Sequence, residues 1–417
     1  MPAPSLKEAL QVYGRIGLMS FGGPAAQIAV MHKELVEDRT WLTEQQYLNA
    51  LSFCMLLPGP EAMQLATYSG WRTHGTVGGV LAGLLFVLPG AIVVLILSLL
   101  YALYGDVPAI EALFLGIKST VVIVVIEALL KVSKKALHGT AHWAIAGLSF
   151  AGIFFFQIPF PLIILIAGAY GFKTSKTKST PAQQVSKGNL PRTVAIWLTL
   201  WWAPIMALWV SGQAFLTQIA MFFSKLAVVT FGGAYAVLAY MTQAVVVENN
   251  WLSTAQMMDG LGLAETTPGP LILVTEFVGF QAGFAQGGIG LAISAAVVTL
   301  WVTFIPCFLW IFAGAPYLEW ITSRPTLRSA LQAITAAVVG VILNLSLWFA
   351  LHVYFSDVAT QSLGSWSTFA MPILTSVNLA AMGLSCLAGY LILVRKLGLL
   401  TVLSLMAIAG LGLTIFV

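Results

Sequence analysis

Two Pro-Gly-Pro sequences interrupt long apolar stretches of this chain, at Pro58-Gly59-Pro60 and at Pro268-Gly269-Pro270. Proline has no backbone donor and clashes with the preceding turn, so each sequence should break a helix. A helix that restarts at the second proline directs its first N–H groups, and the positive end of its dipole, toward the break. Two such helix starts that face each other form an anion-binding site. A pair of purely structural kinks is the alternative explanation.

Two basic residues, Arg15 and Lys225, lie upstream of the breaks inside apolar sequence. Ionisable groups at such positions are costly in a membrane and indicate function by default. Arg15 lies near a helix start and could instead extend its side chain to the headgroup region. That explanation is weaker for Lys225, which has apolar residues on both sides. Lys118 is a third cation in an apolar stretch. We expect Arg15 and Lys225 to counter the charge of a bound anion.

A Phe-Gly-Gly sequence precedes each break, at residues 21–23 and 231–233. Successive glycines permit either close helix packing or contact between the backbone and a substrate. Gln64, Thr266 and Thr267 add neutral hydrogen-bonding groups. The residues expected to bind the anion are Arg15, Gly22, Gly23, Pro24, Gln27, Pro58, Gly59, Pro60, Gln64, Lys225, Gly232, Gly233, Thr266, Thr267, Pro268, Gly269 and Pro270.

Few carboxylates occur in the apolar stretches. One in the first turn of a helix suits the helix dipole without any function, which also explains Glu61. Beside an anion, however, a carboxylate must be protonated or paired, and this is one way to couple transport to protons. Glu61, Glu265, Glu127 and Glu276 are the candidates for such coupling. The sequence contains no nucleophile–base set, phosphate-binding loop or metal-binding spacing, so we expect no metal or cofactor and no enzymatic activity.

The composition excludes a soluble protein. Of the 417 residues, 59% are hydrophobic and only 8% are charged, and the mean hydropathy is +0.93. A soluble protein carries about 25% charged residues. The long apolar runs indicate membrane-spanning helices and do not show the alternation of a β-barrel. The net charge of +4 is too small to indicate a nucleic-acid partner.

The two breaks belong to a repeat. At one constant offset, Phe-Gly-Gly, Trp-Leu and Pro-Gly-Pro all recur, Ser20 corresponds to Thr230, and Arg15 to Lys225. We therefore divide the chain into a first repeat at 1–172, a basic linker at 173–192, an extra helix at 193–212 and a second repeat at 213–417. The linker has no acidic residue and is expected to be disordered and cytoplasmic.

The charges of the loops predict the topology. The positive-inside rule is obeyed throughout if the amino terminus is cytoplasmic and the carboxyl terminus periplasmic. The extra helix then inverts the second repeat. The expected fold is an all-α integral membrane protein with two inverted repeats of about six helices and one linking helix, or about 13 spans. The expected helical segments are 10–30, 46–70, 78–100, 110–130, a two-helix hairpin at 143–171, 193–211, 214–245, 255–280, 286–312, 331–352, 368–394 and 398–417. Inverted repeats with broken helices are typical of secondary transporters.

With these residues in view, the whole chain resembles the long two-domain form of the chromate ion transporter family. The resemblance lies in Ser-Phe-Gly-Gly-Pro-Ala-Ala-Gln-Ile-Ala at 20–29, Leu-Leu-Pro-Gly-Pro-Glu-Ala-Met-Gln-Leu-Ala-Thr-Tyr at 56–68 and Phe-Val-Leu-Pro-Gly at 86–90. Thr-Phe-Gly-Gly-Ala-Tyr-Ala-Val-Leu at 230–238 and Ala-Glu-Thr-Thr-Pro-Gly-Pro-Leu at 264–271 resemble its carboxyl-terminal signature, although Ala264 stands where glycine is expected.

The resemblance implies an exporter of chromate in the bacterial inner membrane, driven by the proton motive force, with sulfate as a competing analogue. Chromate, protons and the lipid bilayer are the implied partners, and a homodimer is left open. The residues themselves indicate only an anion transporter. A transporter or exchanger of sulfate or another tetrahedral oxyanion, or an anion channel, therefore remains an alternative.

Overall fold

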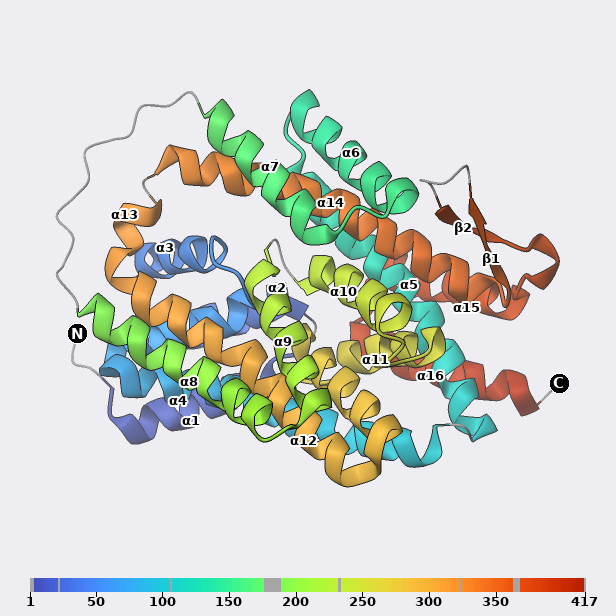
Figure 1. Cartoon of the computed structure of the whole chain (residues 1–417), viewed down its shortest axis with the longest axis horizontal. Helices are drawn as coiled ribbons and strands as arrows, with labels where there is room; N and C mark the ends of the chain where they lie inside the picture. Colours follow the sequence, from blue (N-terminus) through green and yellow to red (C-terminus); the bar gives the residue numbers. More distant parts are fainter. Residues whose placement is uncertain are drawn as a thin grey trace. The chain divides into compact units, whose positions relative to one another are not determined.

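The computed structural model describes residues 4–21, 23–105, 107–175, 189–231, 234–322, 324–362 and 368–415 (Figure 1). The middle of the predicted linker, residues 176–188, lies outside them, as do Gly22, Gly232 and Gly233. The described chain is almost entirely helical, which confirms the expected all-α class. One small antiparallel sheet pairs β1 (Val358–Ser362) with β2 (Thr368–Pro372), with Val358 opposite Pro372.

The helices gather into two compact units, and each unit contains segments of both sequence repeats. The first unit spans 1–99, 174–237 and 267–329, and the second spans 100–173, 238–266 and 330–417. The first unit contains α1 (Leu6–Met19), α2 (Gly23–His32), η1 (Lys33–Glu37), α3 (Glu44–Cys54), most of α4 (Glu61–Tyr104), α8 (Leu190–Val210), α9 (Ala214–Val229), η3 (Leu271–Leu273), α12 (Val274–Gly314), η4 (Ala315–Tyr317) and α13 (Leu318–Thr322).

The second unit contains the remaining helices and the sheet. Its helices are α5 (Pro108–Ala136), α6 (Thr140–Phe156), α7 (Phe160–Thr174), most of α10 (Ala234–Thr242), η2 (Gln243–Glu248), α11 (Thr254–Thr266), most of α14 (Pro325–Tyr354), η5 (Leu374–Ser376), α15 (Leu379–Gly389), η6 (Tyr390–Val394) and α16 (Leu399–Ile415). Within it, α5 packs against α15 and α16. The predicted two-helix hairpin at 143–171 is confirmed as α6 and α7, which are separated by residues 157–159.

Among the described residues, five helical stretches are long and apolar enough to cross a membrane, namely α4, α5, α8, Leu271–Tyr317 and α14. The predicted extra helix at 193–211 is α8.

Two of the stretches fold back on themselves. At Gly75 (φ +61°) α4 reverses, and a Cβ atom added to Gly70 would lie 2.3 Å from the carbonyl oxygen of Gly78. The turn expected between residues 70 and 78 is therefore confirmed, and the one expected at 281–285 falls at 287–288 in α12.

Three expected helices differ from the structure. The helices expected at 10–30 and 214–245 are each broken at Phe-Gly-Gly, because α1 ends at Met19 and α9 at Val229. The hydroxyls of Ser20 and Thr230 donate back to the carbonyls of Ile16 and Leu226, both at 2.6 Å, and the glycines that follow favour a break.

The prediction of a helix at 368–394 is also wrong for the first part of this segment. Residues 368–372 form β2, in which Thr368 and Phe369 are residue types that favour strands. The helix α15 begins only at Leu379, where the side chain of Asn378 accepts a 2.9 Å hydrogen bond from the Ala381 amide. The sequence signal for this helix start was therefore the cap at Asn378.

Candidate functional site

The segments before the two breaks have matching local geometry. The helix α3 begins with a capping box, in which Thr43 accepts from the Gln46 amide at 3.2 Å and Gln46 accepts from the Thr43 amide at 3.1 Å. Ser253 and Gln256 form the same pair of bonds at the start of α11, at 3.1 and 2.9 Å. Each capping box satisfies two amides that the first turn of a helix leaves without intrahelical partners. The two sequence copies thus build the same approach to their breaks.

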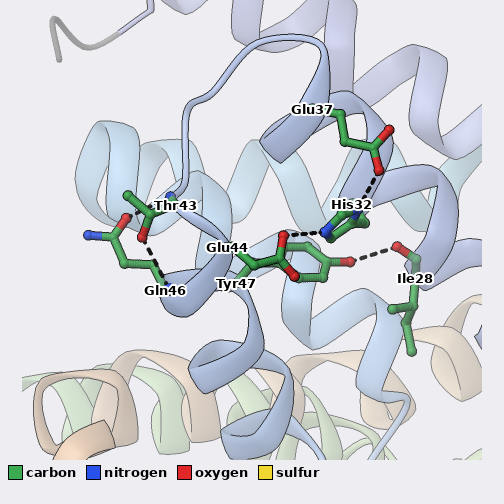
Figure 2. A network of polar contacts seen from close by, with 7 residues as sticks. All are labelled: Ile28, His32, Glu37, Thr43, Glu44, Gln46 and Tyr47. Atoms are coloured by element: carbon green, nitrogen blue, oxygen red, sulfur yellow. Dashed lines mark hydrogen bonds and ion pairs between the residues drawn. The ribbon is translucent and has the colours of Figure 1, made fainter.

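In the first copy, a network of charged and polar groups joins α2 and η1 to α3 (Figure 2). His32 lies between two carboxylates, with Nδ1 3.0 Å from Glu37 Oε1 and Nε2 2.7 Å from Glu44 Oε2. The hydrogen bond to Glu44 raises the pKa of His32 above its usual value, and Glu37 adds to this rise. The Tyr47 hydroxyl donates to the carbonyl of Ile28 at 2.6 Å. These bonds hold the end of α2 against the helix that leads to the first break.

Each break forms a hydrogen bond with the end of the first helix of the other copy. We call this reciprocal pair of contacts the exchange of the breaks. The Gly59 amide, in the first break, donates to the carbonyl of Thr230 at the end of the second copy's first helix, at 2.8 Å. The Gly269 amide, in the second break, donates to the carbonyl of Ser20 at the end of the first copy's first helix, also at 2.8 Å. Both glycines have positive φ, +117° and +87°. Reciprocal contacts of this kind are what a two-fold relationship between the copies generates.

Side chains extend the exchange. Gln27 Nε2, from the first copy, donates to the carbonyl of Gly269 at 2.6 Å. Gly90, also from the first copy, lies so close to the second break that an added Cβ atom would be 2.2 Å from the Pro268 oxygen. Conversely, a Cβ atom on Gly59 would lie 2.8 Å from Cys307 Sγ of the second copy. Each break is therefore packed against the other copy.

Two glutamines beside the breaks keep a buried acceptor without a hydrogen-bond partner among the described residues. Gln64 Nε2 donates to the carbonyl of Pro58 at 2.7 Å, so the orientation of each amide is set by its donor. The oxygens Gln27 Oε1 and Gln64 Oε1 lack a partner, and the two residues are 1% and 0% exposed. Buried acceptors of this kind normally bond to a donor. These positions therefore suit water or a ligand that brings a donor group.

The predicted cations lie on the surface of the first unit. Arg15 has a side chain that is 60% exposed, and its Nε is 3.5 Å from Oε1 of the buried Glu34. Arg39 Nη1 pairs with the other oxygen of Glu34. Lys225 is exposed at the position that corresponds to Arg15. Glu34 and Arg39 are absent from the sequence-based site, and the available signal for them was the run of mixed charges at 32–44.

The predicted coupling acids occupy different surroundings. Glu61 is half-buried in the first turn of α4, and Glu276 is 1% exposed near the start of α12. In the second unit, Glu265 is buried in α11, and Glu127 pairs with Lys131 at 2.7 Å. The remaining predicted ligands are Thr266, whose hydroxyl donates to the carbonyl of Leu263 in its own helix at 2.8 Å, and the buried Thr267.

Lys118, the other predicted cation, has an acidic partner in the second unit. Lys118 Nζ is 2.8 Å from Asp259 Oδ1, and the hydroxyl of Tyr101 donates to Asp259 Oδ2 at 2.8 Å. Sequence reasoning missed both partners. The available signal for Asp259 was its place inside the apolar segment expected at 255–280. Among the described residues, no group of three or more His, Cys, Asp or Glu side chains could hold a metal ion.

This architecture defines a helical integral membrane protein in which two related segments exchange their helix breaks. The family described as chromate transporter matches residues 8–172 and 217–413, close to the two predicted repeats. The chain therefore belongs to the chromate transporter family.

Relatives match most of the chain. A probable chromate transport protein of Synechococcus elongatus is 31% identical over 344 residues, which cover 82% of this chain and 84% of the relative. The chromate transport protein of Cupriavidus metallidurans is 29% identical over 350 residues, or 82% of each chain. That of Pseudomonas aeruginosa is 31% identical over 348 residues, covering 82% of this chain and 80% of the relative. No solved structure matches.

Proposed function

We propose that the chain is a secondary active transporter that exports chromate across the bacterial inner membrane, driven by the proton motive force. Membership of the chromate transporter family supports chromate as the substrate, since relatives covering about four fifths of the chain carry that name. The observation that carries the transport mechanism is the exchange of the two breaks, because broken helices at a repeat interface are where secondary transporters bind substrate.

The oxyanion is held between the two breaks of the first unit. The start of α4 at Glu61 supplies the positive end of a helix dipole. The middle amides of the breaks are already bonded to Thr230 and Ser20, so the remaining contacts come from the helix starts and from Gln27 and Gln64. The unpartnered oxygens of these glutamines favour an oxyanion that carries a proton or its own hydration water. Arg15 and Lys225, at matching exposed positions, attract the anion to the unit.

Transport proceeds by alternating access, in which one repeat moves against the other around the site. The reciprocal bonds support this, because the two contacts are equivalent by a two-fold operation. The inward-facing and outward-facing states can therefore have the same number of hydrogen bonds at the breaks. A carboxylate carries the coupled proton, and the sequence nominates Glu61, Glu265, Glu127 and Glu276 for that role.

Chromate uptake into everted membrane vesicles tests this function. Energised vesicles that contain the chain should accumulate chromate, and an uncoupler should abolish the accumulation. Equimolar sulfate tests the substrate, because a site that prefers sulfate will lose most of its chromate uptake at equal concentrations of the two anions. Uptake that only equilibrates, and that an uncoupler does not alter, would identify a channel and overturn the proposal.

A further inference from the structure

An ion pair links α5 and α11 in the second unit, within otherwise apolar sequence. Lys118 Nζ lies 2.8 Å from Asp259 Oδ1, and the two side chains are 20% and 8% exposed. Only 8% of the residues in this chain are charged, so a largely buried pair of opposite charges is unusual here, and burying it costs desolvation free energy. Such pairs seldom stabilise a protein relative to apolar replacements, because desolvation offsets the attraction. A role beyond stability is therefore worth testing.

The geometry around Asp259 permits it to change its protonation state while keeping one contact. Its Oδ2 accepts a hydrogen bond from the Tyr101 hydroxyl at 2.8 Å, and a neutral carboxylic acid can accept the same bond. Protonation therefore removes only the attraction to Lys118. Glu111, on the same helix as Lys118, lies near enough to interact electrostatically with Asp259 and opposes a second negative charge there. The released Lys118 ammonium then needs another anion.

We propose that Lys118 and Asp259 form a proton-linked oxyanion switch, a second oxyanion site that lies in the second unit and is separate from the breaks. There a tetrahedral oxyanion replaces the Asp259 carboxylate at Lys118, and Asp259 takes up one proton from water, as a further coupling acid beside the four that the sequence nominates. This inference rests on the proposed function. In each cycle the carboxylate gains one proton when the ion pair opens and returns it when the pair closes, and the lysine stays charged. A dianion and a proton then cross together with one net negative charge. The membrane-potential component of the proton motive force drives this charge outward, while the proton itself moves against its gradient.

The switch predicts a linkage between oxyanion and proton. Since one proton is taken up for each oxyanion bound, the affinity for chromate should fall about tenfold for each unit by which the pH rises, over the range in which Asp259 is ionised. Asp259→Asn removes the titrating group and the competitor for Lys118. The chromate affinity of this variant should therefore be independent of pH, and at alkaline pH it should be higher than that of the wild type. Lys118→Gln should bind chromate more weakly.

The experiment is chromate binding to the purified full-length chain at alkaline pH, where chromate is the dianion, with proton uptake followed in weakly buffered solution. The double variant K118M/D259L removes both charges together. Proteins usually tolerate the replacement of a whole buried ion pair by apolar residues, so a folded protein is expected. It should lose the proton uptake. The matched control K134Q/D357N removes one exposed base and one exposed acid from the same unit and should behave as wild type.

The outcomes separate this inference from the proposed function. If the wild type binds chromate and the folded double variant binds it with the same affinity and the same proton uptake, the ion pair is structural and the switch is overturned. If the double variant fails to fold, D259N alone decides, because an unchanged pH dependence in that variant also overturns the switch. If the wild type binds no chromate at all, the proposed function itself has failed.

Discussion

The Gly59 amide donates a 2.8 Å hydrogen bond to the carbonyl oxygen of Thr230. This bond joins the break of one sequence copy to the end of a helix in the other, and Gly269 and Ser20 form its counterpart. Because each copy completes the break of the other, neither half of the motif is complete alone. The duplication in the sequence therefore acts as one structural feature, and changes at either break should affect both copies.

The first prediction concerns Gly59, which combines a φ of +117° with a close neighbour, Cys307 Sγ, 2.8 Å from the position of an added Cβ atom. Gly59→Ala should lower the free energy of unfolding by about 2–4 kcal/mol, from backbone strain together with overpacking. Gly23→Ala is the control, since Gly23 has a φ of +80° but open space around it, and should cost only about 1–2 kcal/mol. Denaturation of the purified protein in detergent measures both. Equal losses would show that the two close neighbours of Gly59, Cys307 Sγ and Gln64 Nε2, both 2.8 Å from the added Cβ atom, are unimportant.

The second prediction concerns Gly90 in the second arm of α4. An alanine Cβ there would lie 2.2 Å from the Pro268 carbonyl oxygen, so the second break must shift. Gly90→Ala should destabilise the protein by about 1–3 kcal/mol and reduce transport. Gly147→Ala, in a helix with open space at that position, should instead be stabilising by up to about 1 kcal/mol. Thermal unfolding and chromate uptake are the measurements, and a Gly90→Ala protein with wild-type values for both contradicts the packing of the second break.

The third prediction concerns pH and His32. The hydrogen bonds that His32 donates to Glu44 and Glu37 raise its pKa, so the folded protein holds this proton more tightly than the unfolded chain. The stabilisation is then fully present below the ordinary imidazole pKa of about 6.5 and is lost as pH rises through the raised value. His32→Gln should lower the unfolding temperature most at acidic pH.

A double-mutant cycle checks the origin of this effect. Glu44→Gln should reproduce the pH-dependent loss, and the pair H32Q/E44Q should lose less than the sum of the single variants, because both remove the same interaction. A loss of stability that is the same at acidic and alkaline pH would assign His32 a packing role only.

The fourth prediction concerns topology, which follows from loop charges and the extra helix α8. Cysteine at Gln361 should react with a membrane-impermeant maleimide in intact cells, whereas cysteine at Lys134 should react only after permeabilisation. Cys54 and Cys307 are buried, and Cys386 is exposed, so a Cys386→Ser background is needed. Labelling of both positions from the same side would rule out the inverted arrangement of the repeats.

Periodicity and breaker residues were enough to predict most helices, because apolar length and Pro-Gly-Pro are local signals. The split at Phe-Gly-Gly was not predicted, since it depends on Ser20 and Thr230 bonding back to their own helices and on partners from the other copy. The strand at 368–372 was missed for a similar reason, because its pairing with 358–362 is a contact between separate segments.

For the candidate site, the sequence identified the two breaks but not their exchange. Offset alignment pairs each residue with its own equivalent, Arg15 with Lys225 for example, and is blind to a contact between Gly59 and Thr230. The ion pair of Lys118 and Asp259 was missed because its members lie in different repeats and do not correspond by offset. Such partners become visible only in three dimensions.

The central claim is that the two exchanged breaks bind the oxyanion together, and chromate binding to the purified protein tests it most directly. Gln27→Leu and Gln64→Leu remove one polar side chain from beside each break, and Gln45→Leu removes an exposed glutamine of α3 as the control. Titration calorimetry should show that each of the first two variants weakens binding by about tenfold, as expected when a buried amide oxygen no longer accepts a hydrogen bond from the protonated or hydrated oxyanion. Gln45→Leu should bind as wild type. Folded Gln27→Leu and Gln64→Leu proteins that bind chromate with wild-type affinity would contradict the account.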